Sequence, residues 1–333
     1  MRSSTSSSKS RLPHCGWLKV WAPGLILALI GVAEWNHVWT DRGFTPGVSN
    51  SANAWAEARA KVSPEAVVVL GTSRAQAAID PSVWQKAWPE RPIVNLAMVG
   101  TSPLATFEHL AGTTGFSGIL IVDFPPFFVF NVDRDPNTLT MGLDAWRELR
   151  SSPSRRWEAA LGSLLDEGAV LRHPDLNLRL ALGGILTGSI PSPPTFTMRR
   201  DRFNFLSQDY QKLPLNSADY EIYRTGGAAA TPLQRDSILA RFGAALEGLR
   251  ARGGDAVFIS FPTCGERRRI EAQRYPSSTY WEVAKIKIDG VFLGDEYPEL
   301  DGDSWLCADG SHLHVEDTEP FTRWLATFVR SIL

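Results

Sequence analysis

Four short, largely apolar runs most constrain the fold of this chain. They are Ala66–Leu70, Pro92–Ala97, Gly118–Val122 and Ala256–Phe261. Continuous apolar runs are typical of parallel strands that are covered on both faces, whereas strands with one face in solvent alternate apolar and polar residues. Segments with helical patterns, such as Leu233–Arg252, separate the runs. This alternation predicts a three-layer α/β/α sandwich around a mostly parallel sheet.

One stretch interrupts the alternation. Residues 134–232 carry helical patterns around Trp146, Leu161 and Leu180, followed by a Pro/Ser-rich segment and several aromatic residues. Because this stretch has no strong boundaries of its own, we interpret it as a helical insertion within one domain that spans residues 62–333. We expect it to form a cap beside the edge of the sheet where parallel α/β proteins bind ligands.

The N-terminal segment predicts export from the cytoplasm. A basic, Ser-rich tail (1–16) precedes the uncharged run Val20–Ala33, and few basic residues follow, which places the tail inside and the rest of the chain outside. The run fits the core of a signal peptide, with Gly31–Ala33 as a small-x-small cleavage site. Alternatively, 17–39 is an uncleaved transmembrane anchor, which we favour because tryptophans stand at both its ends. Residues 40–61 then form a linker and a short helix.

Charge and cysteine content narrow the range of partners. The formal net charge is -2 over 333 residues. It is spread without long single-sign runs, so no nucleic-acid partner is expected. Of the three cysteines, Cys264 and Cys307 lie in the part predicted to be exported. They either form a disulfide or remain two free buried thiols, and the sequence favours neither. No pattern indicates a cofactor or a metal site.

The tripeptide Gly-x-Ser occurs five times, so position must select among the copies. They begin at Gly47, Gly71, Gly100, Gly115 and Gly302. Only Ser73 and Ser102 stand just beyond the carboxyl end of a predicted buried strand, where parallel α/β sheets place ligands. Ser73 is therefore a candidate nucleophile, although taken alone it would serve equally well as a helix N-cap.

A serine hydroxyl needs a base to remove its proton and a third group to orient that base. Among six histidines, His312 is the best candidate because it follows Asp309 by three residues near the C-terminus. One turn can place this carboxylate against one imidazole nitrogen and leave the other for the serine. Asp309 could instead cap the turn before the last helix. The combination of Ser73 with Asp309 and His312 favours a catalytic triad.

With these motifs the chain resembles the SGNH superfamily, also called GDSL-type hydrolases. The resemblance implies a flavodoxin-like sandwich in which Ser73 is the nucleophile, His312 the base and Asp309 its orienter. It also implies that the backbone N–H groups of Ser73 and Gly100 act as oxyanion donors. The order serine, aspartate, histidine also occurs in α/β-hydrolases, but those place the serine in Gly-x-Ser-x-Gly, and here Ala75 replaces the second glycine.

The chain departs from the SGNH pattern in its third motif, Gly-x-Asn-Asp, whose asparagine supplies an oxyanion donor in that family. The equivalent strand end here carries Asp123, and Asn131 lies further on and does not match. Since removing one oxyanion donor costs roughly 3 kcal/mol in the transition state, another group must substitute or the reaction must be slow.

The membrane-anchored branches of this superfamily, such as alginate-type polysaccharide O-acetyltransferases, are the most similar in layout. The resemblance implies acyl transfer through an acyl-enzyme, in a catalytic domain on the outer side of a bacterial inner membrane. The partners that it implies are an acyl donor, a glycan or small ester acceptor, and a membrane protein that delivers acyl groups. The alternatives are an SGNH esterase or lipase that acts on small esters, or a catalytically decayed, membrane-anchored glycan-assembly protein.

Overall fold

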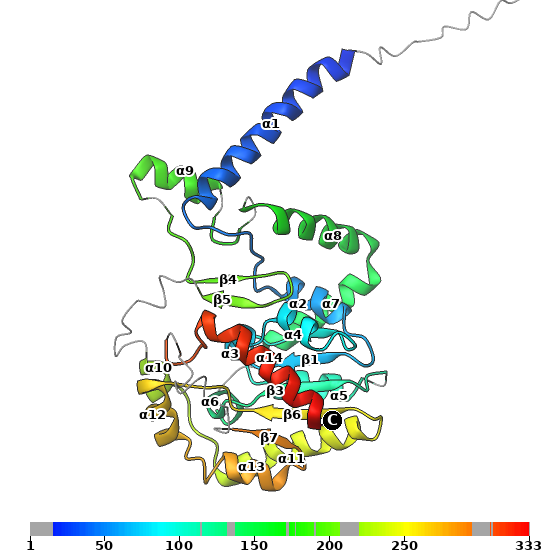
Figure 1. The fold of residues 1–333 in the computed structure, drawn as a ribbon, viewed down its shortest axis with the longest axis vertical. Helices are drawn as coiled ribbons and strands as arrows, with labels where there is room; N and C mark the ends of the chain where they lie inside the picture. The colour runs from blue at the N-terminus through cyan, green and yellow to red at the C-terminus, as the bar shows by residue number, and fades with distance from the viewer. Residues whose placement is uncertain are drawn as a thin grey trace, which may run out of the picture.

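The computed structural model describes most of the chain (Figure 1). The described residues are 16–113, 115–131, 137–170, 173–176, 178–189, 191–206, 220–294, 307 and 309–332. The strands are β1 Val67–Leu70, β2 Ile93–Asn95, β3 Ile119–Asp123, β4 Phe196–Met198, β5 Asn204–Leu206, β6 Asp255–Ile259 and β7 Val291–Leu293. The helices are α1 Gly16–Thr40, α2 Ala52–Ala60, α3 Ser73–Ala78, α4 Pro81–Ala87, α5 Leu104–Ala111, α6 Pro126–Val129, α7 Asn137–Ser151, α8 Pro153–Gly168, α9 Leu178–Thr187, α10 Glu221–Thr225, α11 Pro232–Arg250, α12 Gly265–Arg274, α13 Trp281–Lys287 and α14 Val315–Ile332.

The central sheet has five strands in the order β2-β1-β3-β6-β7, and each of its four pairings is parallel. This confirms the prediction of an α/β fold with a mostly parallel sheet. The order equals the 2-1-3-4-5 order of doubly wound proteins, in which ligands bind outside the carboxyl end of the first strand, where the direction of winding changes. The fold therefore directs attention to the loop that follows β1.

Helices cover both faces of the sheet, which explains the continuous apolar runs. On one face Val68 and Leu70 of β1 pack with Phe107 of α5 and Phe242 of α11. On the other face, strand side chains pack with those of α3, α4 and α14, among them Trp84, Phe321 and Leu325. Every residue of β1 and β3 is buried. Along such a strand, apolar residues do not alternate with polar ones, because neither face of the strand meets water.

The predicted insertion is not wholly helical. It contains α7, which packs against α2, then α8 and α9. It also contains an antiparallel hairpin of β4 and β5, in which Met198 pairs with Asn204. Val48, from the segment between α1 and α2, bridges to Met198 at the edge of this hairpin. Figure 1 shows the hairpin between the layer of α8 and α9 and the N-terminal ends of α3 and α14.

The N-terminal helix α1 projects from one end of the molecule (Figure 1). Its last turns are held by a small apolar cluster in which Trp39 and Phe44 pack with Val170, Leu176 and Ala181 of the insertion. The transmembrane segment predicted at 17–39 coincides with α1. Among the described residues, no helix is long and apolar enough to cross a membrane.

Candidate active site

The nucleophile loop begins at Gly71, directly after β1. Its φ of +136° favours glycine, and a Cβ atom there would lie 2.2 Å from the Cβ of Asp123 on β3. Thr72 is the N-cap of α3, since its hydroxyl accepts a hydrogen bond of 3.2 Å from the backbone N–H of Arg74. Ser73 is then the first residue of the helix. The interpretation of Ser73 as the N-cap is wrong, because Thr72 holds that position and the side chain of Ser73 is used elsewhere.

Ser73, His312 and Asp309 lie in one hydrogen-bonded chain. The Nε2 atom of His312 lies 2.8 Å from the Oγ atom of Ser73, and its Nδ1 atom lies 2.6 Å from the Oδ2 atom of Asp309. A carboxylate only accepts hydrogen bonds, so Nδ1 carries the proton and Nε2 is left to accept one from the serine. This is the geometry of a nucleophile, a base and an orienting group.

Asp309 also holds the backbone of its own loop. Its Oδ1 atom accepts hydrogen bonds from the backbone N–H groups of Ser311 at 2.9 Å and His312 at 2.7 Å. Burial alone would raise the pKa of Asp309, but the hydrogen bonds and charge of His312 and these backbone donors lower it to about 2. The carboxylate is therefore ionised throughout the physiological range. Asp309 thus caps the turn before α14, which begins at Val315, and its other oxygen contacts His312, so the two interpretations of this residue hold together.

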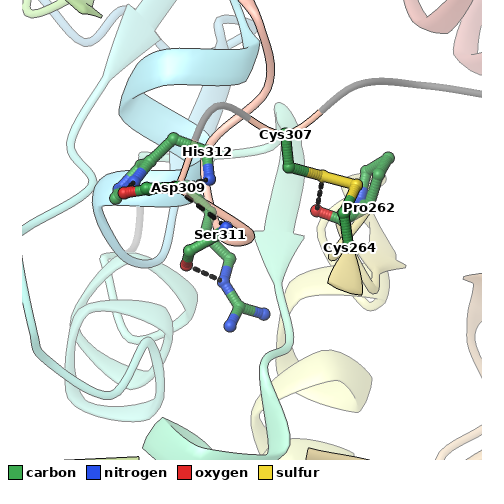
Figure 2. Close-up of a disulfide and its surroundings, with 7 residues drawn as sticks. Pro262, Cys264, Cys307, Asp309, Ser311 and His312 are labelled. Carbon is green, nitrogen blue, oxygen red and sulfur yellow. Dashed lines mark hydrogen bonds and ion pairs between the residues drawn. A yellow bond between two sulfur atoms is a disulfide. The ribbon is translucent and has the colours of Figure 1, made fainter. Parts of the chain in front are cut away.

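A disulfide between Cys264 and Cys307 secures the loop that carries the base, with a Cα–Cα distance of 5.7 Å. This decides between the two interpretations of the cysteines. The backbone N–H of Cys264 also donates a hydrogen bond of 3.0 Å to the carbonyl of Gly310. Figure 2 shows the disulfide beside Asp309 and His312. The loop is thus tied to the segment between β6 and α12 just before the residues that face Ser73.

Arg74 joins the nucleophile helix to the same loop. Its Nε atom donates a hydrogen bond of 3.0 Å to the hydroxyl of Ser311. Its guanidinium forms a two-pronged ion pair with Glu271 of α12, which also accepts a hydrogen bond of 2.8 Å from Arg267. Burial would lower the pKa of Arg74, but the charge of Glu271 raises it, so the guanidinium stays charged although it is only 2% exposed. No local sequence pattern indicates this ion pair, because Arg74 and Glu271 are 197 residues apart.

Asp123 occupies the position where the family pattern places its third motif, and it supports the nucleophile loop. Its Oδ2 atom accepts hydrogen bonds from the N–H of Thr72 at 3.0 Å and from its hydroxyl at 2.6 Å. Complete burial raises the pKa of Asp123 to about 6, against the opposing effect of Arg74. Asn131 does not replace the missing asparagine, since its side-chain N–H donates to the carbonyl of Gly226 at 3.0 Å.

Gly100, the predicted oxyanion donor, lies in the loop after β2 with a φ of +71°. That loop is tied to the nucleophile loop, because the N–H of Met98 donates to the carbonyl of Gly71 at 2.8 Å. The side chain of Gln76 on α3 also donates to the carbonyl of Ala97 at 2.7 Å. The two loops are therefore held side by side at the carboxyl edge of the sheet. The donor role of Gly100 remains a prediction.

The β4–β5 hairpin reaches the base, which the sequence did not predict. The ring of Phe196 meets the imidazole of His312 edge to face, with 5.1 Å between the ring centres. The hairpin is fixed by Arg202, a fully buried residue with a φ of +67°, which donates hydrogen bonds to the carbonyls of Asn95 and Ala97. Arg199 adds an ion pair with Asp80, the N-cap of α4. The insertion thus forms one wall of the site.

Neither a protein-family model nor a curated protein matches this chain. In the part of the chain that the structure describes, no three His, Cys, Asp or Glu side chains are grouped so that they could hold a metal ion. The function must therefore be argued from the geometry of Ser73, His312 and Asp309.

Proposed function

We propose that this protein is a serine-dependent acyl-transfer enzyme that forms an acyl-enzyme at Ser73. The observation that carries the proposal is the placement of His312, within hydrogen-bonding distance of Ser73 on one side and Asp309 on the other. Ser73, at the start of α3, and His312, in the loop before α14, are 239 residues apart in sequence. A base that is oriented by a partly buried carboxylate and aimed at a strand-end serine is the arrangement that activates a hydroxyl nucleophile.

In the first half of the reaction, the Oγ atom of Ser73 attacks an ester carbonyl while its proton passes to Nε2 of His312. Asp309 stabilises the imidazolium that forms. When the tetrahedral intermediate collapses, the bond to the leaving alcohol breaks and His312 returns the proton to its oxygen. In the second half, the hydroxyl of an acceptor loses its proton to His312 and attacks the acyl-serine. The bond between the acyl carbon and Oγ of Ser73 then breaks, His312 returns the proton to Oγ, and the new ester is released, or the free acid when the acceptor is water.

The oxyanion of each intermediate is stabilised, in this proposal, by the backbone N–H groups of Ser73 and Gly100. Asp123, at the position of the third motif, supports the nucleophile loop by accepting hydrogen bonds from the N–H and hydroxyl of Thr72. It does not supply a side-chain amide, so the site operates with one donor fewer than the SGNH pattern. Such a site favours activated or tightly held acyl donors over a high rate on simple esters.

The resemblance to membrane-anchored SGNH proteins makes polysaccharide O-acetylation or deacetylation outside the cytoplasm the preferred activity. The Cys264–Cys307 disulfide supports an exported domain, because disulfides persist in oxidising compartments. Side chains such as Leu25 and Ile30 of α1 are more than half exposed, which supports an N-terminal attachment to the bacterial inner membrane. A membrane protein that delivers acyl groups completes the proposed set of partners.

Labelling with a fluorophosphonate tests the nucleophile. We expect covalent labelling of the wild-type chain and none of Ser73→Ala. Ser102→Ala is the matched control, since Ser102 stands in the equivalent loop after β2 and makes only a local contact of 3.4 Å to the N–H of Leu104. Labelling that persists in Ser73→Ala, or is absent from the folded wild-type chain, would refute the proposal.

A second assay separates the transferase from the esterase. Release and transfer of acetate from an activated acetyl ester are measured with and without a glycan acceptor. Transfer predicts slow hydrolysis in water and faster turnover when acceptor is present. Hydrolysis at full rate without acceptor would favour the esterase. If neither hydrolysis nor transfer is detected and Ser73 is not labelled, the remaining alternative is a catalytically decayed glycan-assembly protein. The missing asparagine of the third motif favours that alternative.

A further inference from the structure

Most of the large apolar side chains that are exposed in the described part of the chain lie on three helices at one end of the molecule. They belong to α1, α8 and α9, and they include Leu25, Ile26 and Leu27 of α1, Trp157 and Leu161 of α8, and Leu182 and Leu186 of α9. Figure 1 shows α8 and α9 beside the base of α1, at the end from which α1 projects. Exposed apolar surface on this scale marks an interaction site.

The apolar side of α8 points away from the protein body. Ala159 and Gly162 line a groove against α2, together with Ala54. At about 100° per residue, Trp157 and Leu161 fall on the opposite side of the helix from these two. Trp157 is 70% exposed and Leu161 is 59% exposed. The helix therefore has one face on the domain and an apolar face turned outward.

Helix α9 likewise has one face packed on the protein and an apolar face that is exposed. Ala181 is fully buried in the cluster around Trp39 at the base of α1. Leu182 and Leu186 lie about 100° and 140° around the helix from Ala181, and Leu186 is 87% exposed. Because Ala181 and Trp39 share one packed cluster, the outward face of α9 is fixed relative to the base of α1.

The exposed apolar side chains of α1 indicate whether lipid or another protein covers this end of the molecule. Three consecutive residues, Leu25, Ile26 and Leu27, are each more than half exposed, so their side chains point to different sides of the helix. A helix that is apolar on every side is buried either in the core of a large protein or in a membrane. No described part of this chain covers these residues of α1, which favours lipid. Amphipathic helices that carry Trp and Leu on their apolar face lie in the plane of a bilayer surface, with that face about 5–10 Å below the headgroups.

We propose that α8 and α9 dock on a lipid bilayer surface through Trp157, Leu161, Leu182 and Leu186, on either side of α1. This docking surface orients the domain, because α9 packs with Trp39 at the base of α1 and precedes in sequence the hairpin whose Phe196 contacts His312. The hairpin then lies between the docked helices and the N-terminal end of α14, and α11 and α13 lie at the far end of the molecule (Figure 1). The inference goes beyond acyl transfer and does not depend on the chemistry of Ser73.

Depth-dependent fluorescence quenching tests this docking surface in the full chain. An environment-sensitive fluorophore is attached at Leu161→Cys or Leu186→Cys after Cys15→Ser has removed the one cysteine outside the disulfide. The protein is reconstituted in phosphatidylcholine vesicles that contain a lipid spin-labelled near its headgroup. Matched controls are Leu233→Cys on α11 and Ile286→Cys on α13, which are 82% and 83% exposed.

We expect several-fold stronger quenching and a blue-shifted emission at positions 161 and 186 than at positions 233 and 286. Equal quenching at all four positions would overturn the proposal. Protection of positions 161 and 186 from water without lipid quenching, accompanied by cross-linking between chains, would also overturn it and would assign the surface to a second copy. The same measurement in Ser73→Ala should give the same result, which separates this inference from the proposed enzymatic function.

Discussion

Replacing Asp309 by asparagine tests the triad with the smallest possible change of shape. The Oδ1 atom of Asp309 accepts hydrogen bonds from the N–H groups of Ser311 and His312 at 2.9 and 2.7 Å. An amide must keep its oxygen at that position, because an NH₂ group there would face two donors. Its NH₂ group then takes the place of Oδ2, 2.6 Å from Nδ1 of His312, and donates to it.

The consequence is a reversed tautomer. When Nδ1 of His312 accepts a hydrogen bond, Nε2 carries the proton and points it at Ser73, 2.8 Å away, so the serine loses its base. The corresponding change in a serine protease triad lowers kcat by roughly 10⁴-fold, which corresponds to about 5.4 kcal/mol of transition-state stabilisation. We expect a loss of this order for Asp309→Asn, with little change in KM.

The assay is the initial rate of acetate release from an activated acetyl ester, supported by the rate of fluorophosphonate labelling. Stability is measured in parallel. Because the pKa of Asp309 is lowered to about 2, its charge stabilises the fold above its ordinary pKa, and that contribution is lost as the pH falls toward 2. The variant should therefore lose at most about 2.5 kcal/mol of unfolding free energy at pH 7. A folded Asp309→Asn variant within tenfold of wild-type activity would refute the assigned roles.

Three further predictions concern the groups that support the site. Replacing both Cys264 and Cys307 by serine should lower the free energy of unfolding by about 4 kcal/mol, the loop-closure value for their separation of 43 residues, and should reduce labelling of Ser73 at temperatures where the fold persists. Gly71→Ala should destabilise by at least about 2 kcal/mol in urea denaturation, because its Cβ would lie 2.2 Å from that of Asp123, whereas Gly248→Ala, with open space around it, should not. Since burial raises the pKa of Asp123 to about 6, the wild type should lose stability relative to Asp123→Asn as the pH rises from about 4 to 6, by roughly 2 to 3 kcal/mol, and a pH-independent difference would contradict this.

The sheet could be predicted because burial on both faces leaves a direct mark on the sequence. Every residue of Val67–Leu70 and of Ile119–Asp123 is buried, so both strands stand out as apolar runs. The edge strand Val291–Leu293 was missed. It has three residues, of which two are only partly buried, and a run this short is not distinguishable from a loop.

The triad was predictable in part because Asp309 and His312 share one loop. Their spacing of three residues is visible in the sequence, and the place of Ser73 follows from the rule that ligands bind at the carboxyl ends of parallel strands. By contrast, Asp123 meets Thr72 across 51 residues. No local pattern encodes a contact between two strand ends. The sequence therefore shows that the asparagine is absent, but it does not predict that Asp123 binds Thr72.

The hairpin was missed for a different reason. Its turn contains Arg202 with a φ of +67°, a conformation that arginine rarely adopts and that glycine or asparagine usually marks. The conformation is imposed by tertiary contacts, since the buried guanidinium donates to the carbonyls of Asn95 and Ala97. Tertiary contacts thus override the local preference, and Phe196 reaches His312 without any signal in the sequence around it.

Several contacts between distant parts of the chain act on the loop that carries His312, and the reason is physical. Ser73 sits at the first position of a helix that directly follows a buried strand, so regular secondary structure already fixes it. His312 lies in the loop before α14, where the described backbone forms an isolated bridge between Cys307 and Leu313 but no regular strand or helix. The disulfide, the two backbone bonds to Asp309, the link from Arg74 to Ser311 and the ring of Phe196 all act on this loop. A triad needs its base held within a fraction of an ångström, so these supports gather at a loop that lacks regular secondary structure.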